Sequence, residues 1–375
     1  MSTNKQAFRQ VSGLEFRLVQ LALFVNLYWI ALKLYRHPLK AGRALKRLIR
    51  HGQNVSGAQP LQKGFAIDGK YGWDMFHPLW PSPAFDKFFT HHLEELMPSG
   101  KRLGVLRRLL VAITKRCPLQ CAHCSEWDTL NQADILDRET LREKIQELVD
   151  YGVSQIVYSG GEPLSRFSDL VYLVGHFRDS SQWIYTSGYG LSMEKAKKLK
   201  AAGLTGVAVS LDHHLPNGHN HFRGSLKAFE WVRKAIANCQ AVGLLVSVNV
   251  CPTKEYLAEH GFQSFIDLML TWQVPIVNVL EPRAVGHFAG QDVAYGPSEK
   301  QLMEDFFRRY NFSDQRQIGP IITYPGLSRK KVRCGGGISY LLLDDDGTLR
   351  PCPFCKTPIQ SPAQQDSPVR ESCEA

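Results

Sequence analysis

The sequence predicts an α/β fold in which six strand–helix units form an incomplete parallel barrel. From residue 109 onward, short runs of apolar and β-branched residues alternate with longer segments of helical periodicity. A glycine follows the last helical residue of several of these segments, as expected at the end of a helix. Strand–helix repetition indicates a parallel sheet with right-handed crossovers. Because six units are recognisable without a clear seventh, we expect the barrel to remain open.

The predicted elements follow one another along the chain. Arg138–Tyr151 is expected to be a helix closed by Gly152, and further helices are expected over residues 194–202 and 226–242. Catalytic residues of parallel barrels lie where the strands end. The predicted strand ends therefore mark the candidate site, and they fall near Thr114, Tyr158, Thr186, Asp212, Val250 and Glu281.

Positive charge is concentrated ahead of the predicted barrel. Residues 1–110 carry 17 Lys and Arg against 6 Asp and Glu, whereas the remaining residues carry 28 against 29. The composition of 44% hydrophobic and 21% charged residues is otherwise ordinary for a globular protein. Because no recognisable nucleic-acid-binding module accompanies the basic segment, no specific nucleic-acid partner is expected.

The first fifty residues contain an apolar segment and then a basic one. The fifteen uncharged residues from Leu18 to Leu32 would span about 22 Å as a helix, against roughly 30 Å for a bilayer core. Basic residues then recur every three or four positions from Lys40 to Arg50. Three interpretations stay open: contact with an anionic membrane surface, a helix packed on the main domain, and, least favoured, a true span.

Cysteine usage indicates a reducing compartment. The chain has nine cysteines, most of them in two clusters, as is typical of metal ligands, and no secretory signal is recognisable. The expected location is the cytoplasm, with peripheral contact at the inner membrane surface as an extension of that prediction. Residues 64–98 are rich in aromatic residues and proline, and we expect a packed lead-in to the barrel without chemistry of its own.

The first cysteine cluster is Cys117-Pro-Leu-Gln-Cys121-Ala-His-Cys124, which directly follows the first predicted strand. Three thiolates on one loop can surround a soft metal centre and suit an iron–sulfur cube that keeps one iron free. A zinc knuckle that shares a distant fourth ligand is the alternative.

A glycine-rich turn, Gly160-Gly161-Glu162-Pro163, ends the second predicted strand. Two glycines allow the backbone to approach a ligand closely, and we expect an exposed carboxylate directly after them. This tetrapeptide alone is a weak signal, but its position 36 residues after Cys124 makes it informative.

The two motifs together resemble the signature of the radical S-adenosylmethionine (radical SAM) superfamily. The resemblance implies a partial (β/α)6 TIM-like barrel and a [4Fe-4S] cluster whose free iron chelates S-adenosylmethionine. It also implies an external reductant, such as ferredoxin or flavodoxin, and cleavage to a 5′-deoxyadenosyl radical that abstracts hydrogen from a substrate. The implied cluster ligands are Cys117, Cys121 and Cys124, and the implied S-adenosylmethionine contacts include Gly160, Gly161, Glu162 and Pro163.

Further contacts to S-adenosylmethionine are expected at the next strand ends. Ser187 follows the third strand, Ser210 lies near the end of the fourth, and Arg223 follows it along the chain, where it would pair with the ligand's carboxylate. Ordinary strand-end turns are the alternative. Asp212 and Glu281 are the candidate catalytic residues, although an ion pair between Glu281 and Arg283 would be a purely structural explanation. Four histidines are assigned to a polar loop rather than to a second metal: His213, His214, His219 and His221.

The second cysteine cluster lies near the C-terminus. A β-hairpin that turns at Asp346-Gly347 should bring Cys334 beside Cys352 and Cys355. The pattern resembles the twitch or SPASM extensions of radical SAM enzymes and implies one auxiliary [4Fe-4S] cluster, with zinc as the alternative. Cys373 is a candidate fourth ligand. The remaining cysteines, Cys239 and Cys251, are predicted to be buried thiols.

We therefore predict three regions: a basic N-terminal extension over residues 1–104, a barrel over 105–312, and a small auxiliary iron–sulfur domain over 313–375. The predicted function is reductive cleavage of S-adenosylmethionine and hydrogen abstraction from a small-molecule substrate, lipid-like or quinone-like. Modification of a peptide or protein is the alternative within the same family. From another class, a non-catalytic iron–sulfur or zinc protein for electron transfer or scaffolding would explain the cysteines alone.

Overall fold

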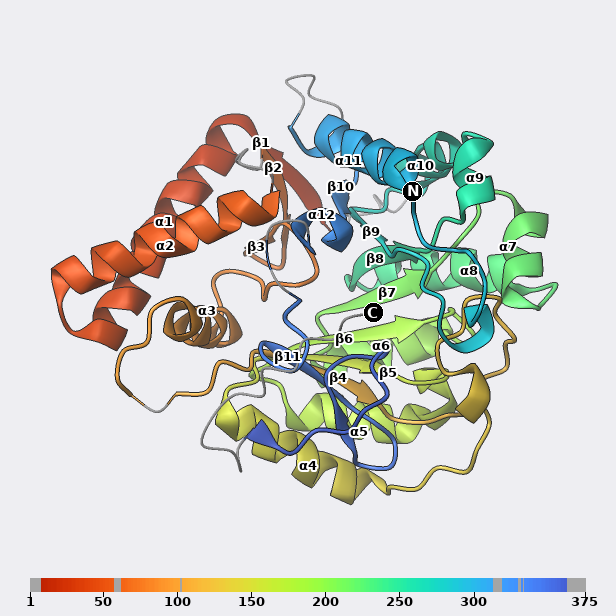
Figure 1. The fold of residues 1–375 in the computed structure, drawn as a ribbon, viewed down its shortest axis with the longest axis horizontal. Coiled ribbons are helices and arrows are strands. Elements are labelled where there is room, and N and C mark those ends of the chain that lie inside the picture. Colours follow the sequence, from red (N-terminus) through yellow and green to blue (C-terminus); the bar gives the residue numbers. More distant parts are fainter. Residues whose placement is uncertain are drawn as a thin grey trace.

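A nine-stranded open sheet forms the body of the protein (Figure 1). The computed structural model describes residues 8–56, 62–101, 103–312, 319–329, 332 and 334–362. Six parallel strands lie side by side in chain order at the centre of the sheet. They confirm the predicted α/β open barrel, and every strand ends within two residues of its predicted end: β4 (Arg108–Ala112), β5 (Gln155–Ser159), β6 (Ser181–Thr186), β7 (Gly206–Ser210), β8 (Leu245–Val250) and β9 (Ile276–Val279).

Helices follow the strands and cover the outer face of the sheet (Figure 1). In the first of them, Asp137 caps the start, the buried residues Leu141, Ile145 and Leu148 form one face, and Gly152 ends the helix as predicted. The helices are α4 (Arg138–Tyr151), α5 (Phe167–His176), α6 (Met193–Ala202), α7 (Pro216–Arg223), α8 (Ala228–Ala241), α9 (Lys254–Ala258), α10 (Gly261–Thr271) and α11 (Pro297–Phe312), with short 3-10 turns η1 (Trp127–Thr129), η2 (Pro163–Arg166) and η3 (Gly286–Phe288).

The segment after residue 312 extends both edges of the sheet. After α11, β10 (Ile321–Thr323) pairs parallel with β9 and adds a seventh strand, which is too short to stand out in the sequence. A short helix, α12 (Pro325–Arg329), follows it. β11 (Tyr340–Leu343) pairs parallel with β4, and β12 (Leu349–Arg350) returns antiparallel beside β11. Strand pairing therefore crosses the proposed boundary at residue 312, and the division into three regions stays a prediction.

The N-terminal extension has its own small sheet and three helices. β1 (Arg9–Ser12) pairs antiparallel with β2 (Lys63–Ile67), which pairs with β3 (Lys70–Gly72). Between β1 and β2 the chain forms α1 (Gly13–Tyr35) and α2 (Pro38–Ser56), and α3 (Pro83–Leu96) follows the sheet. Residues of all three helices share a separate hydrophobic core that includes Ile30, Leu34, Leu45, Phe85 and Phe89.

The first part of the segment over residues 64–98, up to residue 79, packs against the inner face of the barrel, whereas α3 belongs to the separate helical core. Phe65, Met75 and Leu79 form one buried cluster with Val157 and Trp183 from the strands. The Gln155 side chain donates a 2.7 Å hydrogen bond to the carbonyl of Met75. This packing confirms the predicted lead-in and covers the inner face of the barrel near the start of several strands, where Leu245, Ile276 and Ile321 belong to the same cluster.

Helix α1 is longer than the uncharged run suggested. It has 23 residues because Glu15, Arg17 and Lys33 are also helical, which gives about 34 Å at 1.5 Å per residue. Among the described residues, it alone combines the length and the composition that could cross a bilayer, and 22% of its most apolar window is buried. One side of the helix is packed on the protein, as the second interpretation expected, and the other side is exposed.

Candidate active site

The loop after β4 carries the first three cysteines and is held by its neighbours. The N–H of Ala122 donates to the Phe222 carbonyl at 2.9 Å, at the end of α7. The N–H of Cys117 donates to Asn131 Oδ1 at 2.9 Å, and Asn131 has a left-handed φ of 61°, which asparagine tolerates. The loop has no regular secondary structure around the cysteines, so these contacts determine its shape.

The three thiols of this loop lie near enough to influence one another. Burial raises the pKa of Cys117 to about 12, and the neighbouring Cys121 and Cys124 sulfurs add to the rise. Burial likewise raises the pKa of Cys124 to about 11, with a further contribution from Cys121. Throughout the described ranges, no three His, Cys, Asp or Glu side chains gather closely enough to hold a single metal ion.

The surroundings of the thiols fit an anionic iron–sulfur cluster. Arg223 Nη1 lies 3.5 Å from Cys121 Sγ and brings a positive charge to the thiolates. His123 Nδ1 is buried without a hydrogen-bond partner in the structure, and its ring stacks on Phe222 at 4.9 Å. An unpartnered buried nitrogen in the loop that carries three soft sulfur donors fits a bound group near this loop. The ligand roles of Cys117, Cys121 and Cys124 stay predictions.

The glycines after β5 are required by the cysteine loop itself. A Cβ atom on Gly160 would overlap the Thr114 carbonyl oxygen, and one on Gly161 would overlap that of Arg116. The N–H of Gly161 donates to Thr114 at 2.7 Å, and that of Glu162 donates to Arg116 at 2.8 Å. The close approach that demands glycine is thus between two loops of this chain, and it fixes the start of the cysteine loop.

Glu162 is buried, with 1% of its surface exposed, so the expected exposed carboxylate is wrong. Because β5 and β6 are neighbours, the Glu162 carboxylate after β5 lies against the turn that follows β6. It accepts four hydrogen bonds, from Leu164 N (3.2 Å), Thr186 Oγ1 (2.7 Å), Ser187 N (2.9 Å) and Ser187 Oγ (2.6 Å). Burial raises the pKa of Glu162, and the bonds from Ser187 and Thr186 oppose the rise. Pro163 starts η2 directly beside them. The contacts of these residues with S-adenosylmethionine stay predictions.

A buried charge network joins α7 to the cysteine loop. Arg223 donates through Nε and Nη2 to Asp212 Oδ2, each at 2.6 Å. Asp212 Oδ1 accepts the Cys251 N–H at 3.0 Å. Burial favours protonation of Asp212, but the charge of Arg223, the nearby His123 and His219 and the Cys251 N–H together outweigh it, and the pKa of Asp212 is lowered. Arg223 therefore has two partners within the chain, a carboxylate and a thiol, and its predicted pairing with a ligand carboxylate stays untested.

Apart from Ser210, whose contact with S-adenosylmethionine stays a prediction, the polar row at the ends of the last strands was not predicted. Ser210 is half-buried on β7 and pairs in register with the buried Asn249 of β8. Asn278 donates to Asn249 at 3.2 Å, and Thr323 donates to Asn278 at 2.8 Å. The sequence contained a signal, because asparagine is depleted in strands and Asn278 interrupts the otherwise apolar strand β9.

A second missed contact comes from the loop after β9. His287 N donates to the Cys124 carbonyl at 2.9 Å, and His287 Nδ1 lies 3.0 Å from the Cys121 carbonyl oxygen. The imidazole stacks on Trp127 with ring centroids 3.9 Å apart. A Cβ atom on Gly286, whose φ is 55°, would overlap the Cys124 oxygen. No local sequence pattern predicts this contact, because it depends on how two distant loops meet.

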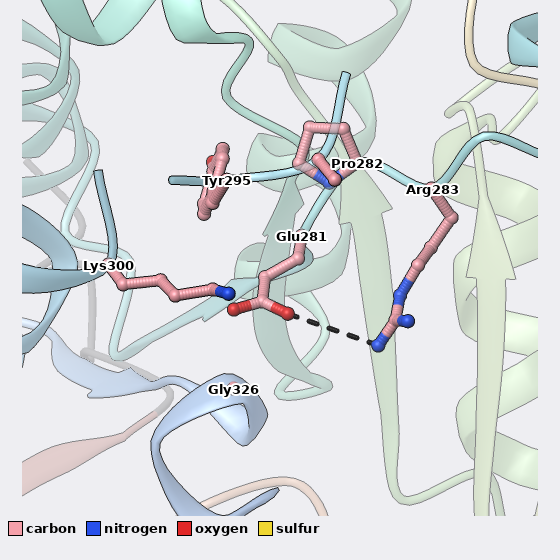
Figure 2. A pocket seen from close by; sticks show the side chains of 7 residues that line it. Glu281, Pro282, Arg283, Tyr295, Lys300 and Gly326 are labelled. Atoms are coloured by element: carbon pink, nitrogen blue, oxygen red, sulfur yellow. Dashed lines mark ion pairs between the residues drawn. The ribbon is translucent and has the colours of Figure 1, made fainter. Parts of the chain in front are cut away.

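A cavity of about 320 Å³ opens beyond the end of β9 (Figure 2). Tyr324 donates to Glu281 Oε1 at 2.6 Å, and Arg283 lies 3.9 Å from Glu281 Oε2. Figure 2 shows the Lys300 ammonium pointing toward the same carboxylate. Glu281 thus forms the ion pair that was its structural alternative and also faces the cavity. The lining residues are Glu281, Pro282, Arg283, Ala294, Tyr295, Lys300 and Gly326.

The C-terminal hairpin brings the second cysteines together. Cys334 Sγ lies 3.7 Å from Tyr340 Oη, and the Cys355 N–H donates to the Cys352 carbonyl at 3.2 Å. Burial raises the pKa of Tyr340, and Cys334 and Cys352 both add to the rise, so both sulfurs lie near one phenol. Gly347 has a φ of 84° in the turn, as expected. Cys373 lies outside the described residues, and the auxiliary ligand set and its metal stay predictions.

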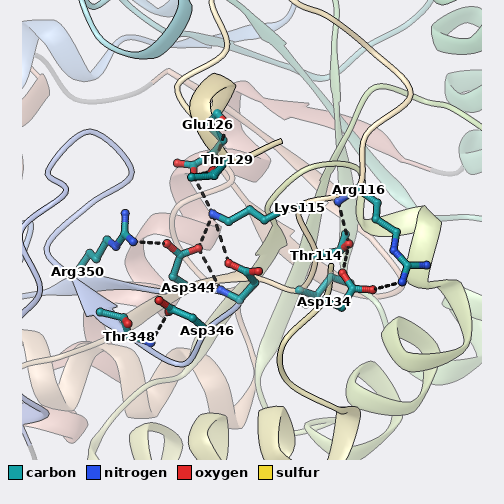
Figure 3. Close-up of polar contacts among 12 residues, drawn as sticks. Thr114, Lys115, Arg116, Glu126, Thr129, Asp134, Asp344, Asp346, Thr348 and Arg350 are labelled. Atoms are coloured by element: carbon teal, nitrogen blue, oxygen red, sulfur yellow. Dashed lines mark hydrogen bonds and ion pairs between the residues drawn. The ribbon is translucent and has the colours of Figure 1, made fainter. Parts of the chain in front are cut away.

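A buried ion-pair network ties this hairpin to the first cysteine loop (Figure 3). Lys115 Nζ donates to Asp344 Oδ1 at 2.6 Å and to Glu126 Oε2 at 2.8 Å. Asp345 lies 3.5 Å away, and Lys356 donates to Glu126 Oε1 at 2.8 Å. Burial lowers the pKa of Lys115, but the carboxylates outweigh it and the pKa is raised. The lysine is therefore charged in the folded protein.

The remaining histidines and cysteines have structural surroundings. His213 and His214 stack with centroids 4.8 Å apart and are partly exposed. His219 is buried within α7 and accepts the Asp212 N–H at 3.1 Å, so its assignment to a polar loop is wrong. Cys239 and Cys251 are buried, as predicted.

Comparisons with known proteins agree with this geometry. Residues 111–267 match the family model of the radical SAM superfamily. A PqqA peptide cyclase from Xanthomonas axonopodis is 28% identical over 261 residues, which cover 66% of this chain and 68% of that protein. Fe-coproporphyrin III synthase from Methanosarcina barkeri is 32% identical over 44% of this chain and 41% of that protein. Streptococcus suis SuiB bound to its precursor peptide SuiA has a similar fold, with a TM-score of 0.60, 13% identity, and coverage of 91% and 80% of the two chains.

The open parallel barrel and the three-thiol loop at its strand ends define an iron–sulfur enzyme. The chain carries a radical SAM domain over residues 111–267. The hairpin with the second cysteines, which follows this domain, is consistent with an extension of the SPASM or twitch kind. The cofactors of this enzyme are a [4Fe-4S] cluster and S-adenosylmethionine. A non-catalytic electron-transfer or scaffold protein is excluded as its class.

Proposed function

We propose that this enzyme abstracts hydrogen from a peptide or protein substrate and thereby modifies it. The observation that carries the proposal is the similarity over two thirds of the chain to a protein named PqqA peptide cyclase. The fold of SuiB, which was solved with a precursor peptide, offers a second and weaker support. A lipid-like or quinone-like substrate, the first expectation from the sequence, has no comparable support among these relatives. The similarity to the coproporphyrin enzyme covers less than half of either chain.

When bound, a [4Fe-4S] cluster and S-adenosylmethionine would supply a 5′-deoxyadenosyl radical after one-electron reduction, and the residues of this chain would hold and surround them. In this proposal Cys117, Cys121 and Cys124 hold the cluster, and Arg223 offsets its negative charge through Cys121. The loop over 160–163 fixes the cysteine loop against β5. Water is limited at these positions because Cys121, Glu162 and Asp212 are buried.

The cavity at the end of β9 is the proposed site for substrate. It has two cations, Arg283 and Lys300, around one carboxylate, Glu281, so it can orient a polar part of a peptide by charge. Arg283 also lies 6.0 Å from the ring centroid of Phe354, which stands between Cys352 and Cys355. The proposed substrate site therefore contacts the segment that carries the second cysteines.

The test is anaerobic reconstitution with iron and sulfide, followed by incubation with S-adenosylmethionine and dithionite. We expect 5′-deoxyadenosine without substrate, and faster formation together with a mass change in a peptide when short peptides encoded beside the gene are added. Cys121→Ala is the control and should show neither. Stimulation by quinones or lipids, with no peptide modified, would contradict the proposal.

A further inference from the structure

The N-terminal helix α1 has an apolar face that nothing in the described part of the chain covers. Large apolar side chains recur at three- and four-residue spacing along it and therefore share one side of the helix. Figure 1 shows α1 and α2 as a pair that stands away from the barrel. The exposed members are Leu14 (74%), Leu18 (58%), Leu21 (62%), Val25 (49%) and Trp29 (55%). We call these five residues the apolar stripe.

The helix pair is also strongly and uniformly basic. Between Glu15 and Asp68 the sequence has no acidic residue. Eight exposed lysines and arginines lie on α1, on α2 and at the turn between them, and in α2 they occupy the side opposite the buried Ala41, Ala44 and Leu48. They are Arg17, Lys33, Arg36, Lys40, Arg43, Lys46, Arg47 and Arg50.

We propose that the α1–α2 pair binds the surface of an anionic membrane, with the apolar stripe among the acyl chains and the basic side chains at the lipid head groups. Apolar side chains next to a dense positive charge match an anionic bilayer in both chemistry and charge. A second copy of the chain is a poor occupant, because joining two stripes would bring two sets of eight positive charges together. The proposal concerns attachment and is independent of the proposed substrate.

The contacts of the other face of α1 argue for surface binding rather than a span. Phe16, Val19, Ile30, Ala31 and Leu34 are buried in the protein. A helix that crossed the bilayer would lose this packing. Such a helix would also lose two hydrogen bonds that α1 makes with the rest of the protein. Asn26 Oδ1 accepts one from Trp80 Nε1 at 2.9 Å, and Tyr35 Oη donates one to the Met97 carbonyl at 2.6 Å.

The experiment is flotation of the full-length reconstituted enzyme with two kinds of vesicle, phosphatidylcholine alone and phosphatidylcholine with phosphatidylglycerol. We expect binding to the anionic vesicles only, with release at high salt because the charges are screened. The triple variant Lys40→Gln, Arg43→Gln, Lys46→Gln should weaken binding about a hundredfold, at about fivefold per charge. Leu14→Gln, Leu18→Gln, Leu21→Gln should weaken it at least as much.

A matched control removes three charges elsewhere. This triple variant changes exposed positions of α6 and α8, as Lys197→Gln, Lys198→Gln and Lys234→Gln. It should bind the anionic vesicles like the wild type. Formation of 5′-deoxyadenosine should be unchanged in all three variants, which shows that they are folded. Equal binding to neutral vesicles, or binding that the apolar-stripe variant leaves intact, would overturn the proposal. A dimer in solution that the apolar-stripe variant dissociates would also overturn the proposal, because a second copy would then cover the stripe. Membrane attachment that resists both high salt and carbonate would overturn it as well, because it would indicate a helix that spans the bilayer.

Discussion

The two cysteine regions differ in how the rest of the chain holds them. The loop of Cys117, Cys121 and Cys124 contacts the turn after β5, the end of α7 and the loop after β9, and buried groups surround it. The hairpin with Cys334, Cys352 and Cys355 sits at the edge of the sheet, beside β4. One buried lysine, Lys115, joins the two. Loops from three other parts of the barrel therefore contact the first region, whereas the second region is attached to the barrel mainly by the pairing of β11 with β4 and by the Lys115 network.

The largest expected effect comes from removing one thiol in each region. Cys121→Ala should abolish 5′-deoxyadenosine formation and remove about four irons per chain, since three thiolates hold one cube. Cys352→Ala should remove a similar amount of iron but keep 5′-deoxyadenosine formation within about twofold, because the second cluster is not where S-adenosylmethionine binds. Iron analysis and product chromatography check both. Unchanged iron in Cys352→Ala would leave zinc, or no metal, at the hairpin.

The second prediction concerns the Lys115 ion-pair network, which connects the two cysteine regions. Lys115→Met removes the buried cation that Glu126 and Asp344 share and leaves them only Lys356 and Arg350 as partners. The loss should lower the free energy of unfolding by up to about 3–5 kcal/mol. Lys234→Met removes an exposed pair with Glu230 and should cost less than about 1 kcal/mol. Anaerobic denaturant unfolding measures both. Equal losses in the two variants would mean that the Lys115 network does not stabilise the fold.

The third prediction compares one glycine beside each region. Gly286→Ala combines a φ of 55° with an overlap on the Cys124 oxygen and should destabilise by about 1–3 kcal/mol. Gly337→Ala has a φ of 81° but its nearest neighbour is the Pro351 Cβ at 3.6 Å, so about 1 kcal/mol is expected. Thermal midpoints and the rate of iron release to a chelator are the measurements. A larger loss at Gly337 would contradict the tighter packing of the first region.

The smallest effect is a pH dependence in the first region. Burial lowers the pKa of His219 to about 3, against about 6.5 in an unfolded chain, so below pH 6.5 the unfolded chain binds the extra proton. Stability should therefore fall as the pH drops, by up to about 2 kcal/mol between pH 6.5 and pH 4.5.

Unfolding of the reconstituted protein at these two pH values measures the effect. His219→Gln should reduce the difference between them. His221→Gln, an exposed position on the same helix, is the control and should keep it. An unchanged difference in His219→Gln would assign the pH dependence to other groups.

Local patterns predicted most of the barrel but not its edges. Each central strand is a run of apolar residues that ends in a polar turn, so β4 to β9 were recognisable. The strand β10 has three residues and becomes a strand only because β9 offers a partner. The long helix α1 was underestimated because charged residues near its ends were taken as its limits, although Glu15, Arg17 and Lys33 are helical.

The candidate site was predicted as a set of positions rather than as a network. The cysteine spacing and the two glycines identified the loops, since both are local. The partner of each polar group was not local. Glu162 is buried because β6 delivers Thr186 and Ser187 beside it, and His287 reaches the cysteine loop from 166 residues away.

The sequence by itself determined the class of chemistry, because thiolate spacing and strand–helix periodicity are properties of neighbouring residues. Only the tertiary structure decided which charges are paired, which carboxylates are buried and which apolar face stays uncovered. These properties arise from contacts between distant segments, as Lys115 and Asp344 illustrate across 229 residues. The free energy of a charge or an apolar side chain depends on what surrounds it after folding, and no local pattern specifies those surroundings.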